Sequence, residues 1–137
     1  MKDETCRSGT DMNVGSDPAA SSDPMHSDCP GRDLFKLITG RWTLLILWSL
    51  KSGSLRFYRI RDVVEGISER VLSSALKDLC RHDLITRHVE PSVPPKVSYS
   101  LTRRGQGLLD LMEHLTDWIA RELDGIEAAK REHDGRG

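Results

Sequence analysis

The residues from 68 to 85 (SERVLSSALKDLCRHDLI) divide by helical angle into two faces of opposite chemistry. At about 100° per residue, polar and cationic side chains fall on one narrow stripe, and aliphatic side chains fall opposite it. The polar stripe holds Arg70, Ser73, Ser74, Lys77 and Arg81. The aliphatic face holds Leu72, Ala75, Leu76 and Leu79. One face can therefore pack in a core while the other contacts phosphates and base edges.

The members of the polar stripe differ in what they can bind. Arginine can form a bidentate hydrogen bond with guanine, and serine can bond base edges or phosphates. Arg70 lies nearest the helix N-terminus, the end that commonly contacts bases, whereas Lys77 and Arg81 lie further along and are expected to meet phosphates. Weaker candidates for contacts with the nucleic-acid backbone are Arg41, Thr43, Arg56 and Lys96. The alternative is that all of these are ordinary exposed polar residues.

The neighbouring segments predict how this helix is held. Residues 55–65 form a second short helical pattern, and Gly66 and Ile67 join the two, which is the length of a helix-turn-helix connection. Residues 85–90 and 97–101 alternate as half-buried strands do, around a loop containing three prolines. This order predicts a mainly α fold with a small β-hairpin wing (α+β), a winged helix-turn-helix with residues 68–82 as the recognition helix.

The chain is long enough for one core, and its charge is unevenly distributed. Of its 137 residues 37% are hydrophobic, which suits a single domain. Residues 1–31 carry 2 basic and 6 acidic side chains, residues 32–104 carry 14 and 7, and residues 105–137 carry 4 and 8. The basic surplus is confined to the segment with the helix-turn-helix pattern, which suits a polyanionic partner. The alternative for the charge alone is a solvated surface.

Composition divides the chain into three parts. Residues 1–28 are rich in Ser, Asp, Gly and Pro and are predicted to be a disordered tail. Residues 29–126 are predicted to form the folded domain, with a first helix from Pro30, an apolar central helix over residues 42–50, and a long final helix after Thr102 as its N-cap. Residues 127–137 are predicted to be a polar C-terminal tail.

Several classes of protein are disfavoured. No secretory signal is visible, and the longest apolar run, residues 44–48, is far shorter than the roughly 20 residues that a bilayer requires. The three cysteines, Cys6, Cys29 and Cys80, do not form a disulfide framework. We therefore expect a reduced, cytoplasmic protein that does not contact a membrane.

From residue 29 to residue 118 the chain resembles the HxlR-type transcriptional regulators, which are winged-helix proteins. The resemblance is carried by the segments CP at 29–30, GRWTLLIL at 40–47, LRF at 55–57, IS at 67–68, LSSALKDL at 72–79 and VPPKVSYSLTRRG at 93–105, with Trp118. Two positions depart from the family pattern: Tyr58 and Arg59 follow LRF in place of a polar residue and glutamate, and Glu65 precedes Gly66 in place of proline. Arg59 adds positive charge, so the operator preference of relatives cannot be carried over.

The resemblance implies a homodimer that binds double-stranded operator DNA and represses or activates transcription, repression being the commoner case in the family. It also implies dimerisation through the first and last helices, here residues 30–39 and 102–123. The apolar stripe of the last helix agrees, because it exceeds what one small domain needs to cover; the alternative is that it completes the monomer core. The expected interface residues are Leu34, Leu37, Leu111, Leu115, Trp118 and Ile119.

Cys29 precedes a predicted helix start, where backbone N–H groups favour a thiolate, although Asp28 opposes this. The resemblance implies a thiol there that senses oxidants or electrophiles, and a cysteine buried at a dimer interface is an equal alternative. Cys80 is expected to pack in the core, and Cys6 is expected to be incidental. A small-molecule or electrophile inducer is compatible with this pattern.

Other functions have weaker support. His26 with Cys29, and Cys80 with His82, are pairs and not the four-ligand set that a structural zinc site requires, so we expect no metal and no cofactor. No nucleophile and base occur at a recognisable spacing, so we expect no enzyme activity. The remaining alternatives are a winged-helix protein-interaction module, which the cationic stripe disfavours, and a ligand- or metal-responsive regulator without thiol sensing.

Overall fold

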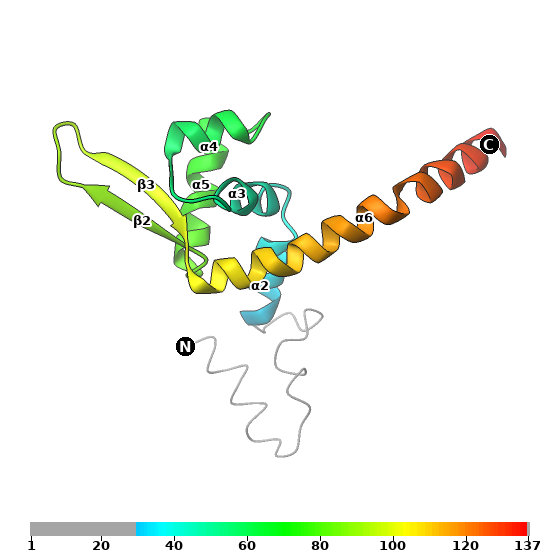
Figure 1. Ribbon diagram of the computed structural model, residues 1–137, viewed down its shortest axis with the longest axis horizontal. Helices are drawn as coiled ribbons and strands as arrows, with labels where there is room; N and C mark the ends of the chain where they lie inside the picture. Colours follow the sequence, from blue (N-terminus) through cyan, green and yellow to red (C-terminus); the bar gives the residue numbers. More distant parts are fainter. Residues whose placement is uncertain (1–29, 137) are drawn as a thin grey trace, which may run out of the picture.

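The computed structural model describes residues 30–136, which form five helices, three strands and their connections (Figure 1). Cys29 and the N-terminal residues before it lie outside the described residues, as does Gly137. The elements follow in the order α2 (Pro30–Ile38), α3 (Thr43–Ser49), β1 (Leu55–Arg56), α4 (Phe57–Val63), α5 (Glu69–Arg81), β2 (Ile85–Glu90), β3 (Lys96–Leu101) and α6 (Arg103–Arg136). The winged helix-turn-helix predicted from the sequence is confirmed.

The three strands form an antiparallel sheet in the order β1-β3-β2. Two corrections to the sequence-based expectation concern this sheet. The helical pattern expected from Leu55 begins only at Phe57, because Leu55 and Arg56 pair with Tyr99 and Ser98 of β3. The alternating burial expected along β2 stops after Ile85, because the rest of the strand extends beyond the core into the wing.

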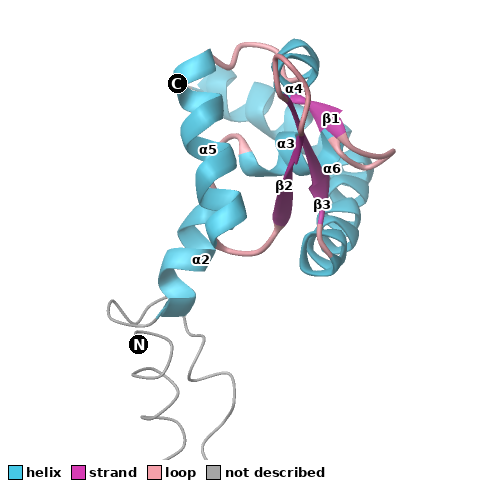
Figure 2. Cartoon of the chain, turned by 90° about the vertical axis from the view of Figure 1, so that its left-hand side faces the viewer, coloured by secondary structure: helices cyan, strands magenta, loops and turns pink. Residues whose placement is uncertain are grey.

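The core lies where the aliphatic faces of α3, α4, α5 and α6 meet the sheet (Figure 2). Ile46 and Leu47 of α3, Ile60 of α4 and Leu109 of α6 are fully buried. On α5 the aliphatic face is buried as predicted, since Leu72, Leu76 and Leu79 are at most 1% exposed. The opposite face of α5 is therefore the one that the core presents to solvent.

Residues on both sides of the turn between α4 and α5 fix where α5 begins. The hydroxyl of Ser68 accepts a hydrogen bond from the amide of Val71 at 3.1 Å, which caps the helix N-terminus. Gly66 occupies a left-handed conformation (φ 89°) in the turn between α4 and α5. The guanidinium of Arg61 on α4 pairs with the carboxylate of Glu69 in the first turn of α5. The turn is thus held by backbone geometry and by an ion pair.

Helix α6 is 34 residues long and extends beyond the rest of the domain (Figure 1). Thr102 caps it as predicted, because its hydroxyl accepts from the amide of Gly105 at 3.0 Å. The segment expected as a polar tail continues the same helix to Arg136. Good helix formers and the ion pairs Lys130–Glu127 and Arg136–Glu132 support this exposed end. The boundaries of the three predicted parts remain a prediction.

None of the described helices is long and apolar enough to span a membrane.

Candidate nucleic-acid interface

The outward face of α5 carries the predicted polar stripe. Arg70, Ser73, Ser74, Lys77 and Arg81 are all exposed. Their helix is rigidly seated, because the residues on its opposite face are buried in the core. The ammonium of Lys77 and the guanidinium of Arg70 have no neutralising ion pair among the described residues, whereas Arg81 lies 3.7 Å from the carboxylate of Asp78. The face that the helix presents is therefore cationic over most of its length.

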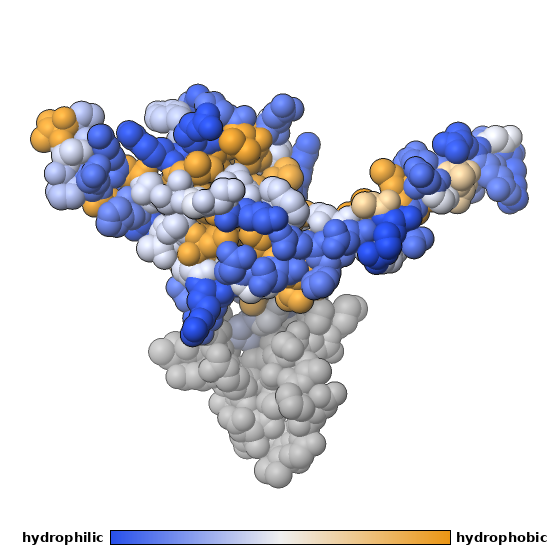
Figure 3. Space-filling view, in the orientation of Figure 1, coloured by the Kyte–Doolittle hydropathy of each residue, from blue (hydrophilic) through white to orange (hydrophobic). Residues whose placement is uncertain are grey.

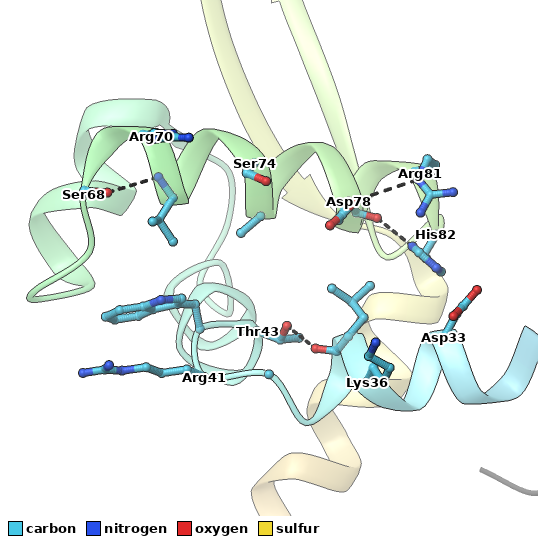
Figure 4. Close-up of a pocket in the computed structure, with 15 residues that line it drawn as sticks. Asp33, Lys36, Arg41, Thr43, Ser68, Arg70, Ser74, Asp78, Arg81 and His82 are labelled. Carbon is cyan, nitrogen blue, oxygen red and sulfur yellow. Dashed lines mark hydrogen bonds and ion pairs between the residues drawn. The ribbon is translucent and has the colours of Figure 1, made fainter. Parts of the chain in front are cut away.

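A groove of about 860 Å³ runs beside this stripe (Figure 4). One wall is α5 and the other is α2 with the turn that leads into α3. Arg70, Ser74 and Arg81 line the groove, whereas Ser73 and Lys77 lie on the far side of the stripe. The stripe thus divides into an edge along the groove and an edge that faces away from it.

The turn between α2 and α3 supplies the opposite rim of the groove. The guanidinium of Arg41 is exposed and lies 4.8 Å from the centre of the Trp42 ring, a cation–π contact that holds it at the rim. Thr43 differs from expectation, because it is only 4% exposed and its hydroxyl donates to the carbonyl of Leu37 at 2.5 Å. The exposed guanidinium of Arg41 can therefore contact a ligand, whereas the Thr43 hydroxyl stabilises the turn.

The remaining candidates lie on the sheet. Lys96 is exposed at the start of β3, next to the tip of the wing. Arg56 lies on the edge strand β1, in register with Ser98 of the central strand β3. His88 of β2 is in register with the same Ser98, so all three side chains share one polar face of the sheet. The structure therefore does not bring Arg56 into the stripe of α5.

The exposed large apolar side chains are most numerous on α6, and others lie on α2 and α3. Figure 3 shows apolar atoms in orange along part of α6. Of the expected interface residues, Leu37 packs against the core and also lines the groove. The others are partly exposed: Leu34 36%, Leu111 66%, Leu115 50%, Trp118 49% and Ile119 42%. This is more apolar surface than one chain covers.

Sequence reasoning missed several residues of both surfaces. Asp78 and His82 line the groove beside Arg81, although at about 100° per residue they lie about 40° and 80° beyond Ser74, between the polar stripe and the aliphatic face. Leu45 and Trp48 of α3 are 45% and 40% exposed, although α3 was expected to be the central core helix. The signal was present, because a short helix that is apolar all round exceeds what one core can bury.

The described residues contain one cysteine and no metal cluster. The thiol of Cys80 is half-buried on α5, and desolvation raises its pKa, while the nearby charge of Arg87 opposes that rise. No group of three or more His, Cys, Asp or Glu side chains in residues 30–136 is placed to hold a metal ion. Cys29 lies outside this part of the chain.

Known proteins share this sequence pattern and this architecture. Residues 37–127 match the model of the HxlR-like helix-turn-helix family. The HTH-type transcriptional regulator YtfH of Escherichia coli is 38% identical over 104 residues, which cover 76% of this chain and 82% of YtfH. The solved structure of YtfH from Salmonella typhimurium superposes with a TM-score of 0.72 at 36% identity and covers 78% of this chain and 96% of its own. The redox regulator HypR, in its reduced form, superposes with a TM-score of 0.66 at 29% identity, over 72% of this chain and 98% of HypR.

Proposed function

Because the chain belongs to the HxlR-like helix-turn-helix family of transcriptional regulators, we propose that it is a homodimer that represses transcription from an inverted-repeat operator. In this proposal α5 enters the major groove of the DNA. Arg70 contacts a base, Ser73 and Ser74 contact base edges or phosphates, and Lys77 and Arg81 contact phosphates. Three further cations contact the DNA backbone. Arg41 does so from the rim of the protein groove, Lys96 from the wing and Arg56 from the edge of the sheet. The buried Thr43 is left out of the proposed surface.

The observation that carries the proposal is the division of α5 into a buried face and a cationic face. The buried face fixes the helix against the core, so the cationic face cannot turn inwards. Residues 32–104, which include this helix, hold the whole basic surplus of the chain. A polyanion is therefore the partner that this surface suits best.

Dimerisation is supported by the apolar surface of α6. Ile119 and Leu123 lie four residues apart, beyond the last buried residue of the helix, Met112, so they continue its apolar stripe. A second copy of the chain would cover this stripe, and the exposed Leu45 and Trp48 of α3 lie on a helix that packs against α6. The interface would then include α3 as well as the two helices predicted from the sequence.

The test is binding to the DNA upstream of the protein's own gene, measured by fluorescence anisotropy. Arg70→Glu and Lys77→Glu should abolish specific binding, because each replaces an attraction to DNA with a repulsion. The matched control is Arg131→Glu, which makes the same charge change at the exposed end of α6. Unchanged affinity in both α5 variants would refute the proposed role of this helix.

We also propose that Cys29 is the residue through which oxidants or electrophiles release the operator. HypR is described as a redox regulator, and Cys29 directly precedes Pro30, the first residue of α2, which carries part of the proposed interface. Cys80 is a poor candidate for the reactive thiol, because burial raises its pKa and so lowers its thiolate fraction. Diamide should release DNA from the wild type and from Cys80→Ser but not from Cys29→Ser. Equal responses of all three proteins would make Cys29 structural and would direct the search for an inducer to a ligand pocket.

A further inference from the structure

The turn that follows α5 is closed tightly onto the end of that helix. Asp83 adopts a left-handed conformation with φ 59°, and its amide donates to the carbonyl of Cys80 at 3.0 Å. The amide of Leu84 donates to the carbonyl of Leu79 at 2.9 Å. Two backbone hydrogen bonds therefore fix Asp83 and Leu84 to the last turn of α5.

The first turn of α6 binds to these same two residues. Thr102 donates from its amide to the carbonyl of Leu84 at 3.1 Å and from its hydroxyl to the carbonyl of Asp83 at 2.7 Å. The guanidinium of Arg104 donates to the carboxylate of Asp83 at 2.7 Å. The same hydroxyl of Thr102 accepts from the amide of Gly105 at 3.0 Å. Main-chain and side-chain hydrogen bonds thus connect the end of α5 to the start of α6.

Gly105 allows the two backbones to touch. A Cβ atom at this position would lie 2.0 Å from the carbonyl oxygen of Leu84 and 3.3 Å from the side chain of Leu101. At Gly107, two residues later in the same helix, a Cβ atom would meet nothing within 4 Å. Since glycine destabilises a helix interior, the close approach is the physical reason for Gly105.

We propose that Asp83, Leu84, Thr102, Arg104 and Gly105, here called the α5–α6 joint, are positioning residues that select the operator by the spacing of its half-sites. The joint fixes the angle between the recognition helix and the helix through which two copies associate. This inference rests on the proposed function, because the spacing matters only in a dimer on DNA.

The length of α6 makes the angle important. At 1.5 Å per residue, Ile119 in the proposed interface lies about 24 Å along the helix from Arg103, so a tilt of about 8° at the joint displaces it by about 3.4 Å. Half-sites one helical turn apart place two recognition helices roughly 34 Å from each other, and one base pair changes that distance by about 3.4 Å. A small error at the joint is therefore equivalent to the wrong operator spacing.

The Asp83–Arg104 ion pair separates this role from a purely stabilising one. The two side chains are 61% and 73% exposed, and exposed pairs of this kind contribute little to the free energy of unfolding. Removal of the Arg104 side chain should leave the melting temperature nearly unchanged while it loosens the angle between the helices.

The experiment compares operator duplexes in which one base pair is added or removed between the half-sites. Gly105→Ala should lose about tenfold affinity for the spacing that the wild type prefers, and Arg104→Ala should lose a smaller, severalfold part of it. Both variants should retain wild-type affinity for a single half-site. The controls are Gly107→Ala and Arg103→Ala, which change the same residue types in the same turns without touching the joint. Arg104→Lys keeps the charge and should restore the wild-type preference.

A second measurement does not depend on DNA. Spin labels at positions 77 and 121, in a protein whose three cysteines are replaced by serine, report the distance between α5 and α6 within one chain when labelled protein is diluted with unlabelled protein. The joint variants should broaden or shift this distance distribution, and the two controls should not.

The two measurements also distinguish this inference from the proposed function. If the wild type binds no upstream DNA, the proposed function fails, and the spin-label distances still test the joint. If Gly105→Ala does not fold, Arg104→Ala decides. A wild-type spacing preference, or a wild-type distance distribution, in the folded joint variants would overturn the proposal.

Discussion

At the scale of single residues, Arg70 and Lys77 occupy the same exposed stripe but are proposed to do different work. Arg70 lies in the first turn of α5 at the edge of the groove, and Lys77 lies two turns later on the far edge. Base contacts specify sequence, whereas phosphate contacts set affinity and its dependence on salt. The roles of the two residues can therefore be distinguished: loss of Arg70 should change sequence discrimination, and loss of Lys77 should change affinity and its dependence on salt.

Lys77→Ala should lower affinity for all sequences alike and reduce the slope of log K against log salt by about 0.9, the value of one phosphate contact. Arg70→Ala should reduce discrimination at one base pair by about 1–3 kcal/mol. Both are measured by anisotropy titrations at several salt concentrations with matched and mutated duplexes. A salt slope that Lys77→Ala leaves unchanged would remove that residue from the interface.

At the scale of elements, the sequence predicted α5 well because its signals are local. Helical periodicity and the cap at Ser68 act within a few residues, so they can be recognised without knowledge of the fold. The strand β1 was missed because Leu55 and Arg56 pair with β3, more than 40 residues later, and the pairing overrides a local helical pattern. The groove was missed for the same reason, since its walls come from α5 and the α2–α3 region.

The cap provides a test at this scale. Ser68→Ala should lower the free energy of unfolding by about 1 kcal/mol, because the amide of Val71 loses its acceptor. Ser73→Ala is the matched control: it is exposed within the helix, where alanine is the better helix former, so it should be neutral or slightly stabilising. Urea titrations followed by circular dichroism measure both. Equal free energies of unfolding for the two variants would show that the hydrogen bond between Ser68 and Val71 does not stabilise the helix.

At the scale of the whole molecule, the wing and α6 extend in different directions from a small core (Figure 1). The core buries the inner faces of the helices, and α6 retains a long apolar stripe that one chain leaves partly exposed. This arrangement separates the proposed DNA surface from the proposed surface for a second copy. The sequence predicted the stripe but not the contribution of Leu45 and Trp48, because which side of an apolar helix faces solvent depends on the packing of distant elements.

Leu115→Asp or Trp118→Asp should produce monomers or insoluble protein, because each places an unpaired charge in the proposed seam. Sedimentation velocity measures the association state. The control is Arg121→Asp, which introduces the same carboxylate on an exposed polar position of the same helix. A soluble Leu115→Asp, Trp118→Asp double variant that still sediments as a dimer would place the interface elsewhere.

If the proposed function is correct, α5 lies in the major groove at each half of an inverted repeat. An iron chelate attached at Ser73→Cys, in a protein whose native cysteines are replaced by serine, cleaves DNA close to the point where it is held. On the upstream DNA we expect two clusters of cleavage, with centres about 10 base pairs or a multiple of that apart. The same chelate at Arg131→Cys should cleave at neither position. No cleavage from position 73 on DNA that the protein binds, or equal cleavage from both positions, would exclude this placement of α5.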